Sequence, residues 1–158
     1  MPDSIDSVCD DGRWWVEHGN LGYDQGDRWT WRDSGYQTGT EVDCSSFILS
    51  LLQKHGYDTG DASYTGNMSD ELCAHGWARL PNDGNPQRGD ILLNDSRHVA
   101  MYIGDGLLIQ ASCGEPGHRV SGGAAGDPTD YETNCRAYYD EPWDCYLRYR
   151  GETEDDVA

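Results

Sequence analysis

The most regular hydrophobic pattern in the chain lies in its first third. Four apolar residues recur at the three- and four-residue spacing of one helix face, namely Phe47, Ile48, Leu51 and Leu52. Asp43, just before them, is a good N-cap, and Gly56, just after, is a natural helix stop. The pattern therefore predicts a helix over residues 44–55. Weaker patterns predict short helices over residues 12–18 and about 69–75.

The second half of the chain carries short apolar runs that are typical of β-strands. Residues 98–103 and 107–111 flank Gly104-Asp105-Gly106, which favours a hairpin. Residues 91–93 and 143–150 predict two further strands, whereas the Gly, Pro, Asp and Ser content of residues 112–131 predicts a long loop. A helix followed by antiparallel strands indicates an α+β fold.

The length and composition indicate one folded domain. The chain has 158 residues and a low hydrophobic fraction of 36%, but six Trp and ten Tyr bury large areas. We expect a single domain over residues 1–150, followed at residues 151–158 by an acidic tail or the start of a linker. We also expect a monomer.

The charge excludes several partner classes. The formal charge is −18, with 29 acidic and 11 basic residues, so no basic stripe is available for nucleic acid or an anionic membrane surface. No apolar run is long enough to span a bilayer. The polar, acidic N-terminus does not resemble a secretory signal. We therefore expect a protein that is made in the cytoplasm without a signal peptide.

The six cysteines form neither a CxxC pair nor the close spacing of a zinc knuckle. Synthesis in the cytoplasm favours reduced thiols, although a late bridge between Cys135 and Cys145 stays open. A zinc site using Cys73 and His75 is a further alternative, and the main interpretation needs no metal and no cofactor.

Cys44 is the candidate nucleophile. A cysteine attacks a carbonyl carbon as the thiolate, and the first turn of a helix favours that anion through its unpaired N–H groups and its dipole. Cys44 follows the predicted N-cap directly, so we expect a lowered pKa for its thiol. The same N–H groups are suited to holding an oxyanion. The alternative role for Cys44 is that of a small buried residue beneath the helix.

A nucleophilic cysteine needs a base and a group that orients the base. His98 opens a predicted strand, and Gln110 lies across the hairpin. The two side chains share a face of the sheet only if the connection has an odd number of residues or contains a bulge. Four other histidines lie at helix ends or in Gly-rich segments and are weaker candidates: His18, His55, His75 and His118. Asp90 is expected to bond backbone groups rather than to act in catalysis.

Four segments in this order resemble the NlpC-type peptidoglycan cysteine peptidases: Asp43-Cys44-Ser45-Ser46, Arg88-Gly89-Asp90-Ile91, His98-Val99-Ala100-Met101-Tyr102-Ile103-Gly104 and Ile109-Gln110-Ala111-Ser112. The segments 64–68 and 143–149 are similar to bacteriophage lysins of that family. The resemblance implies a papain-like α+β fold, with the nucleophile at the N-terminus of a helix that packs on a central antiparallel sheet. It also implies cleavage, after release by lysis or from a virion, of an amide in the stem peptide of bacterial peptidoglycan.

The resemblance further implies roles for single residues. Cys44 is the nucleophile, His98 the base and Gln110 the orienting group, and Tyr23, Asp43 and Ser45 contact the substrate. Gln110 stands where many members of the family have histidine, and it brings no charge to the imidazole. The segment 22–39 lacks the family's usual Trp-Gly-Gly turn. An acyltransferase and a non-catalytic binder of wall peptide are the alternatives on the same fold.

Overall fold

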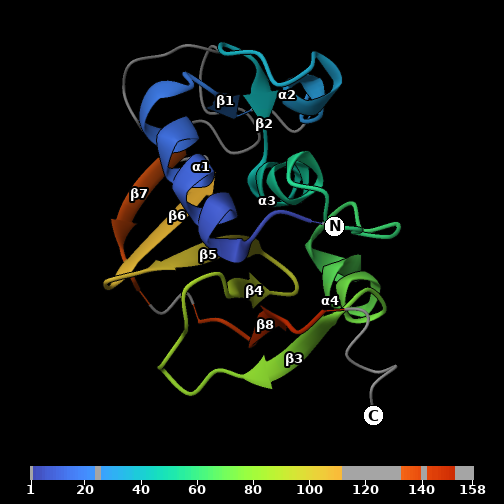
Figure 1. Cartoon of the computed structure of the whole chain (residues 1–158), viewed down its shortest axis with the longest axis vertical. Helices are drawn as coiled ribbons and strands as arrows, with labels where there is room; N and C mark the ends of the chain where they lie inside the picture. Colours follow the sequence, from blue (N-terminus) through green and yellow to red (C-terminus); the bar gives the residue numbers. More distant parts are fainter. Residues whose placement is uncertain (1, 24–25, 112–132, 140–141, 152–158) are drawn as a thin grey trace.

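A six-stranded antiparallel sheet forms the centre of the computed structural model, which describes residues 2–23, 26–111, 133–139 and 142–151 (Figure 1). Along the sheet the strand order is β3-β8-β4-β5-β6-β7. The bounds of the strands are β3 Trp77–Pro81, β4 Ile91–Asn94, β5 His98–Gly104, β6 Leu107–Ala111, β7 Thr133–Ala137 and β8 Cys145–Tyr149. The α+β class expected from the sequence is confirmed.

Two helices cover one face of this sheet. Helix α3 (Cys44–Lys54) contacts β5 and β6, and helix α1 (Ile5–His18) contacts β5, β6 and β7. All residues of α3 from Cys44 to Leu52 are buried, including three serines. Its apolar stripe therefore lies against the sheet, as the spacing predicts, while α1, α2 and the strands surround the rest of the helix (Figure 1).

Gly12 allows α1 to approach this core closely. A Cβ atom at position 12 would lie 2.4 Å from Cδ1 of Ile109 and 2.8 Å from Cδ2 of Leu51. A side chain there would require the ends of the Ile109 and Leu51 side chains to shift, because the core leaves no such space. The glycine thus lets α1 lie close against the strand that carries Gln110.

Shorter elements complete the fold around α3. Strands β1 (Gly22–Tyr23) and β2 (Glu41–Val42) pair in parallel, so that Tyr23 lies opposite Val42. Helix α2 (Thr30–Asp33) contacts β2 and α3, and helix α4 (Thr65–Cys73) contacts β3 and β8. The β1–β2 pair brings residue 23 beside the N-terminus of α3.

The two faces of the sheet bury different sets of side chains. Val99, Met101 and Ile109 belong to the large cluster that includes α3, whereas Ala100 and Leu108 belong to a second cluster. Because side chains alternate along a strand, His98 lies on the face of Ala100, and Gln110 on that of Leu108. The candidate base and its partner therefore face away from α3.

Several expectations about elements need correction. The first helix starts at Ile5 instead of residue 12, and the weaker helix spans Thr65–Cys73 instead of about 69–75. Strands β3 and β7 were not predicted. The predicted loop over residues 112–131 lies outside the described residues, as does all of the predicted tail after residue 151.

The bridge left open between Cys135 and Cys145 is absent, because both thiols are free. Cys135 lies on β7 and Cys145 on β8, and three strands stand between these two in the sheet. At about 4.8 Å per strand, this separation far exceeds the Cα distance that a disulfide spans. Within the described ranges, no helix is both long and apolar enough to cross a bilayer.

Candidate active site

Cys44 is the first residue of α3, and its neighbours hold the helix start in place. Asp43 is the N-cap: its Oδ1 accepts from the N–H of Ser46 at 2.8 Å, while the Ser46 hydroxyl accepts from the N–H of Asp43 at 2.8 Å. This reciprocal capping box satisfies backbone donors that an open helix end leaves without partners. Cys44 is thus placed on a rigid turn, with its side chain 8% exposed.

Three donors surround the sulfur of Cys44. The backbone N–H groups of Ser45 and Val99 and the hydroxyl of Tyr23 hydrogen-bond to it, and each favours the thiolate. Val99 directly follows His98 in β5. The start of β5, which carries His98, therefore lies beside Cys44. Tyr23, expected at the substrate, contacts the sulfur itself.

The pKa of the Cys44 thiol is nevertheless raised, to about 11. Burial is the largest cause, because it removes water from the anion, and the neighbouring charge of Asp43 adds to it. The expectation of a lowered pKa at this helix start is therefore wrong for the free protein. The three hydrogen bonds offset only part of the desolvation, so the resting thiol is protonated and needs a base at the moment of attack.

This raised pKa predicts how Cys44 reacts with iodoacetamide in the absence of substrate. Only the thiolate reacts, so we expect slow labelling near pH 7 and a rate that rises about tenfold per pH unit until it levels off near pH 11. Mass spectrometry of each cysteine measures the rates, with the exposed Cys73 as an internal reference. A Cys44 rate that is already level at neutral pH would mean that a thiolate–imidazolium pair exists before substrate binds.

His98 is bound by Gln110, as the register requires. Nε2 of His98 lies 2.8 Å from Oε1 of Gln110. In the β5–β6 hairpin Met101 pairs with Ile109, and the register shifts between Tyr102 and Gly104. This bulge places Gln110 diagonally across from His98 on one face. The expected bulge or odd connection is confirmed.

Gln110 is only 1% exposed, and both ends of its amide are hydrogen-bonded. Its Oε1 also accepts from the Tyr139 hydroxyl at 2.7 Å, and its Nε2 donates to Oδ1 of Asn134 at 3.2 Å. The indole of Trp143 stacks on the His98 ring, with the centroids 5.9 Å apart, and donates to the Tyr139 carbonyl at 2.8 Å. Gln110 and Trp143 therefore hold the imidazole in place on the face of the sheet opposite α3.

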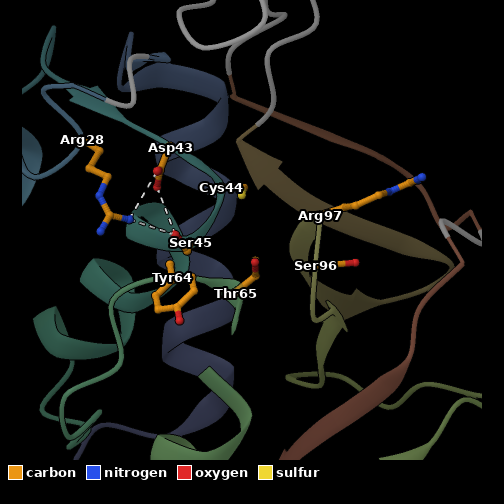
Figure 2. A pocket seen from close by; sticks show the side chains of 8 residues that line it. All are labelled: Arg28, Asp43, Cys44, Ser45, Tyr64, Thr65, Ser96 and Arg97. Atoms are coloured by element: carbon orange, nitrogen blue, oxygen red, sulfur yellow. Dashed lines mark hydrogen bonds and ion pairs between the residues drawn. The ribbon is translucent and has the colours of Figure 1, made fainter. Parts of the chain in front are cut away.

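A pocket of about 370 Å³ opens beside the nucleophile. Figure 2 shows the start of α3 with Arg28 on one side of it, the β4–β5 turn with Ser96 and Arg97 on the other, and Tyr64 and Thr65 below. The Arg97 side chain points away from Cys44 in this view. The pocket is large enough for part of a peptide, and the Cys44 sulfur faces it.

Arg28 binds two of the residues expected at the substrate. Its Nη1 donates to Oδ2 of Asp43 at 3.3 Å and to the Ser45 hydroxyl at 3.2 Å (Figure 2). The Ser45 hydroxyl in turn donates to Oδ1 of Asp43 at 3.2 Å. Both side chains line the pocket, but their polar atoms hold the helix start together. Their contact with substrate stays a prediction.

The other described histidines have structural partners or lie elsewhere. His55 contacts Asp3 and Asp11 at 2.7 Å, and His75 contacts Asp58 at 3.3 Å. His18 lines a separate pocket together with Asn134, and His118 lies outside the described residues. Within the described ranges, no cluster of three or more His, Cys, Asp or Glu is arranged to hold a metal ion.

Sequence reasoning singled out the three central residues but missed those that support them. Arg28, Asn134 and Tyr139 lie 15 or more positions away from the groups that they contact. None of them belongs to a motif in the sequence. Their roles follow only from strand pairing and loop placement.

Comparison with known proteins places this geometry in a family. A family model, described as endolysin-like domain, matches residues 7–109. The match includes Cys44 and His98 and ends one residue before Gln110. No curated protein sequence matches the chain.

Solved structures share the fold at low sequence identity. The P60 domain of an antigen from Mycobacterium avium subspecies paratuberculosis is 20% identical with a TM-score of 0.54, and the alignment covers 92% of this chain and 93% of that one. The peptidoglycan hydrolase RipB from Mycobacterium tuberculosis is 15% identical with a TM-score of 0.52, covering 92% and 68%. An NlpC/P60 family protein from Bacillus cereus is 18% identical with a TM-score of 0.54, covering 95% and 41%.

The family match spans well over half of the chain, and these neighbours share its sheet and helix arrangement. The fold is the papain-like α+β fold of NlpC/P60 domains, as the resemblance implied. The chain belongs to the endolysin-like domain family.

Proposed function

We propose that this protein is a peptidoglycan hydrolase that cleaves an amide bond of the stem peptide by a Cys44–His98–Gln110 mechanism, and that it serves as a phage lysin. In this proposal the protein meets the wall after release by lysis or from a virion. The main observation in support of this mechanism concerns the start of β5. The backbone N–H of Val99 donates to the Cys44 sulfur, and the preceding residue, His98, is hydrogen-bonded to the buried Gln110.

The proposed reaction proceeds in two balanced steps. His98 takes the thiol proton as the Cys44 sulfur attacks the amide carbon, and the proton then passes to the leaving amine while a thioester remains. Water next attacks the thioester, again giving its proton to His98, and the thiol is restored when the carboxylate product leaves. Because the pKa of Cys44 is raised, proton transfer to His98 accompanies the attack.

Two features of the site support stabilisation of the intermediate. The Tyr23 hydroxyl and the N–H groups at the start of α3 lie around the reacting sulfur, where an oxyanion would develop. The pocket beside Cys44 is lined by polar groups from α3, α4 and the β4–β5 turn, which suit an extended peptide. The activity of RipB as a peptidoglycan hydrolase supports the same substrate class here.

The experiment that tests this proposal is mass spectrometry of the products released from defined cell walls. We expect fragments that correspond to the addition of one water at a single kind of amide. The candidate bonds are the D-Glu to diamino acid link, the L-Ala to D-Glu link and the muramoyl to L-Ala amide, and isotopically labelled water marks the new carboxylate.

Two other results would replace the proposal. Products joined to an added amine, with no label from water, would identify an acyltransferase on the same fold. Binding to walls without any released fragment would identify a non-catalytic binder.

A further inference from the structure

The orientation of the Gln110 amide decides which nitrogen of His98 carries the proton. In the structure Oε1 faces Nε2 of His98 at 2.8 Å. An amide oxygen only accepts, so Nε2 must carry the proton and Nδ1 is left as the basic nitrogen. If the amide were turned over, its NH₂ group would face Nε2 and favour the opposite tautomer, in which Nδ1 is already protonated and unable to act as a base.

Asn134 binds the nitrogen end of the Gln110 amide and so favours the productive orientation. It pairs directly with Gln110 across β6 and β7, and its Oδ1 accepts from Nε2 of Gln110 at 3.2 Å. Tyr139 donates to the same Oε1 of Gln110 at 2.7 Å, and the opposite orientation of Gln110 would require the Asn134 amide to turn over as well. Gln110 depends on these protein partners because it is only 1% exposed, so water cannot easily replace a lost hydrogen bond.

We propose that Asn134 is a positioning residue: by accepting from the Gln110 amide it keeps the His98 base in its active tautomer. This inference rests on the proposed Cys44–His98–Gln110 mechanism and adds a fourth residue to it. Asn134 lies on the edge strand β7, on the far side of Gln110 from His98, so it acts only through the glutamine.

The test compares two substitutions of nearly equal size. Asn134→Leu removes the acceptor, so we expect kcat for wall-peptide cleavage to fall about 10-fold with KM nearly unchanged, which corresponds to roughly nine tenths of His98 in the wrong tautomer. Asn134→Asp offers an acceptor only, permits just the productive orientation of Gln110, and is expected to retain most of the kcat. NMR of the imidazole nitrogens reports the tautomer directly: Nε2–H in the wild type and in Asn134→Asp, and a mixture in Asn134→Leu.

Repeating the Asn134→Leu substitution in a Gln110→Glu protein distinguishes an effect on the His98 tautomer from a general effect on folding. Gln110→Glu presents an oxygen to His98 in either orientation, because the two carboxylate oxygens are equivalent. Asn134→Leu should therefore change kcat in the Gln110 protein and have less than about a twofold effect in the Gln110→Glu protein. Equal losses in both backgrounds would assign Asn134 to folding alone and overturn the inference.

Other outcomes are equally decisive. Wild-type kcat and an unchanged Nε2–H tautomer in Asn134→Leu would also overturn the inference while leaving the proposed hydrolase in place. If the wild-type protein releases no wall fragments, the proposed function fails, and the tautomer measured in the two Asn134 variants still decides the role of this residue.

Discussion

Replacing Cys44 by alanine is expected to abolish the clearing of cell-wall suspensions. A thioester needs a sulfur nucleophile, and Cys44 is the one cysteine among the described residues that line the pocket. Loss of a catalytic nucleophile lowers kcat by roughly 10⁶-fold in a well-studied acyl-transfer enzyme. Turbidity of the suspension and the release of muropeptides measure the effect. A fully lytic Cys44→Ala protein would end the proposed mechanism.

The matched control is Cys73→Ala. Cys73 is the exposed last residue of α4 and does not line the pocket at Cys44. We expect wild-type lysis from this variant. The fold should persist in Cys44→Ala as well, because the capping box at the start of α3 uses Asp43 and Ser46 and does not need the thiol. Circular dichroism checks this point.

Replacing Asp90 by alanine is expected to destabilise the fold by about 3 kcal/mol, the lower part of the range for breaking a buried ion pair. Asp90 is 1% exposed, and its carboxylate receives two hydrogen bonds from Arg148, at 2.8 and 2.7 Å, and a third from the N–H of Gln87 at 2.8 Å. The Arg148 side chain is 25% exposed, so its charge reaches water when the partner is lost. Thermal unfolding should show a midpoint lowered by about 6–12 °C.

Asp95→Ala is the control for this prediction. Asp95 makes a similar two-point contact with Arg79, at 3.1 and 2.9 Å, but both side chains are well exposed. An exposed pair contributes about 0–1 kcal/mol, since water solvates both charges in the unpaired state. Equal destabilisation by the two substitutions would show that burial is not what makes Asp90 important. Asp90 itself bonds backbone and arginine, in line with the structural role expected from its place before a strand.

Local patterns predicted the elements whose residues are distinctive. The stripe of α3 and its Asp43 cap, the hairpin around Gly104–Gly106 and the strand that ends the domain were all found, because spacing and turn residues determine them within a few positions. Helix α1 was mostly missed: its buried face includes Gly12 and Cys9 among acidic residues, so its apolar stripe is weak in sequence. Strand β7 was missed for a related reason, since its exposed edge holds polar side chains.

Some features of the candidate site could likewise be predicted from local sequence, and others could not. Cys44, His98 and Gln110 could be selected because a helix cap, a strand start and a hairpin register are local features. The charge state of Cys44 could not be predicted in this way. The helix start alone favours the thiolate, whereas burial by distant segments raises the pKa of the thiol to about 11. Desolvation depends on what packs around a group, and that is a property of the whole fold.

By itself the sequence determined the class of fold and the order of its central elements, and it selected three candidate residues for the proposed acyl transfer. These features depend on periodicity, caps and turn chemistry over short distances. Only the tertiary structure decided that Val99 contacts the sulfur, that Arg28 binds Asp43 and Ser45, and that Asn134 and Tyr139 hold Gln110. The physical reason is that such contacts join segments far apart in the chain, and their geometry is set by sheet pairing and close packing, which no short window of residues contains.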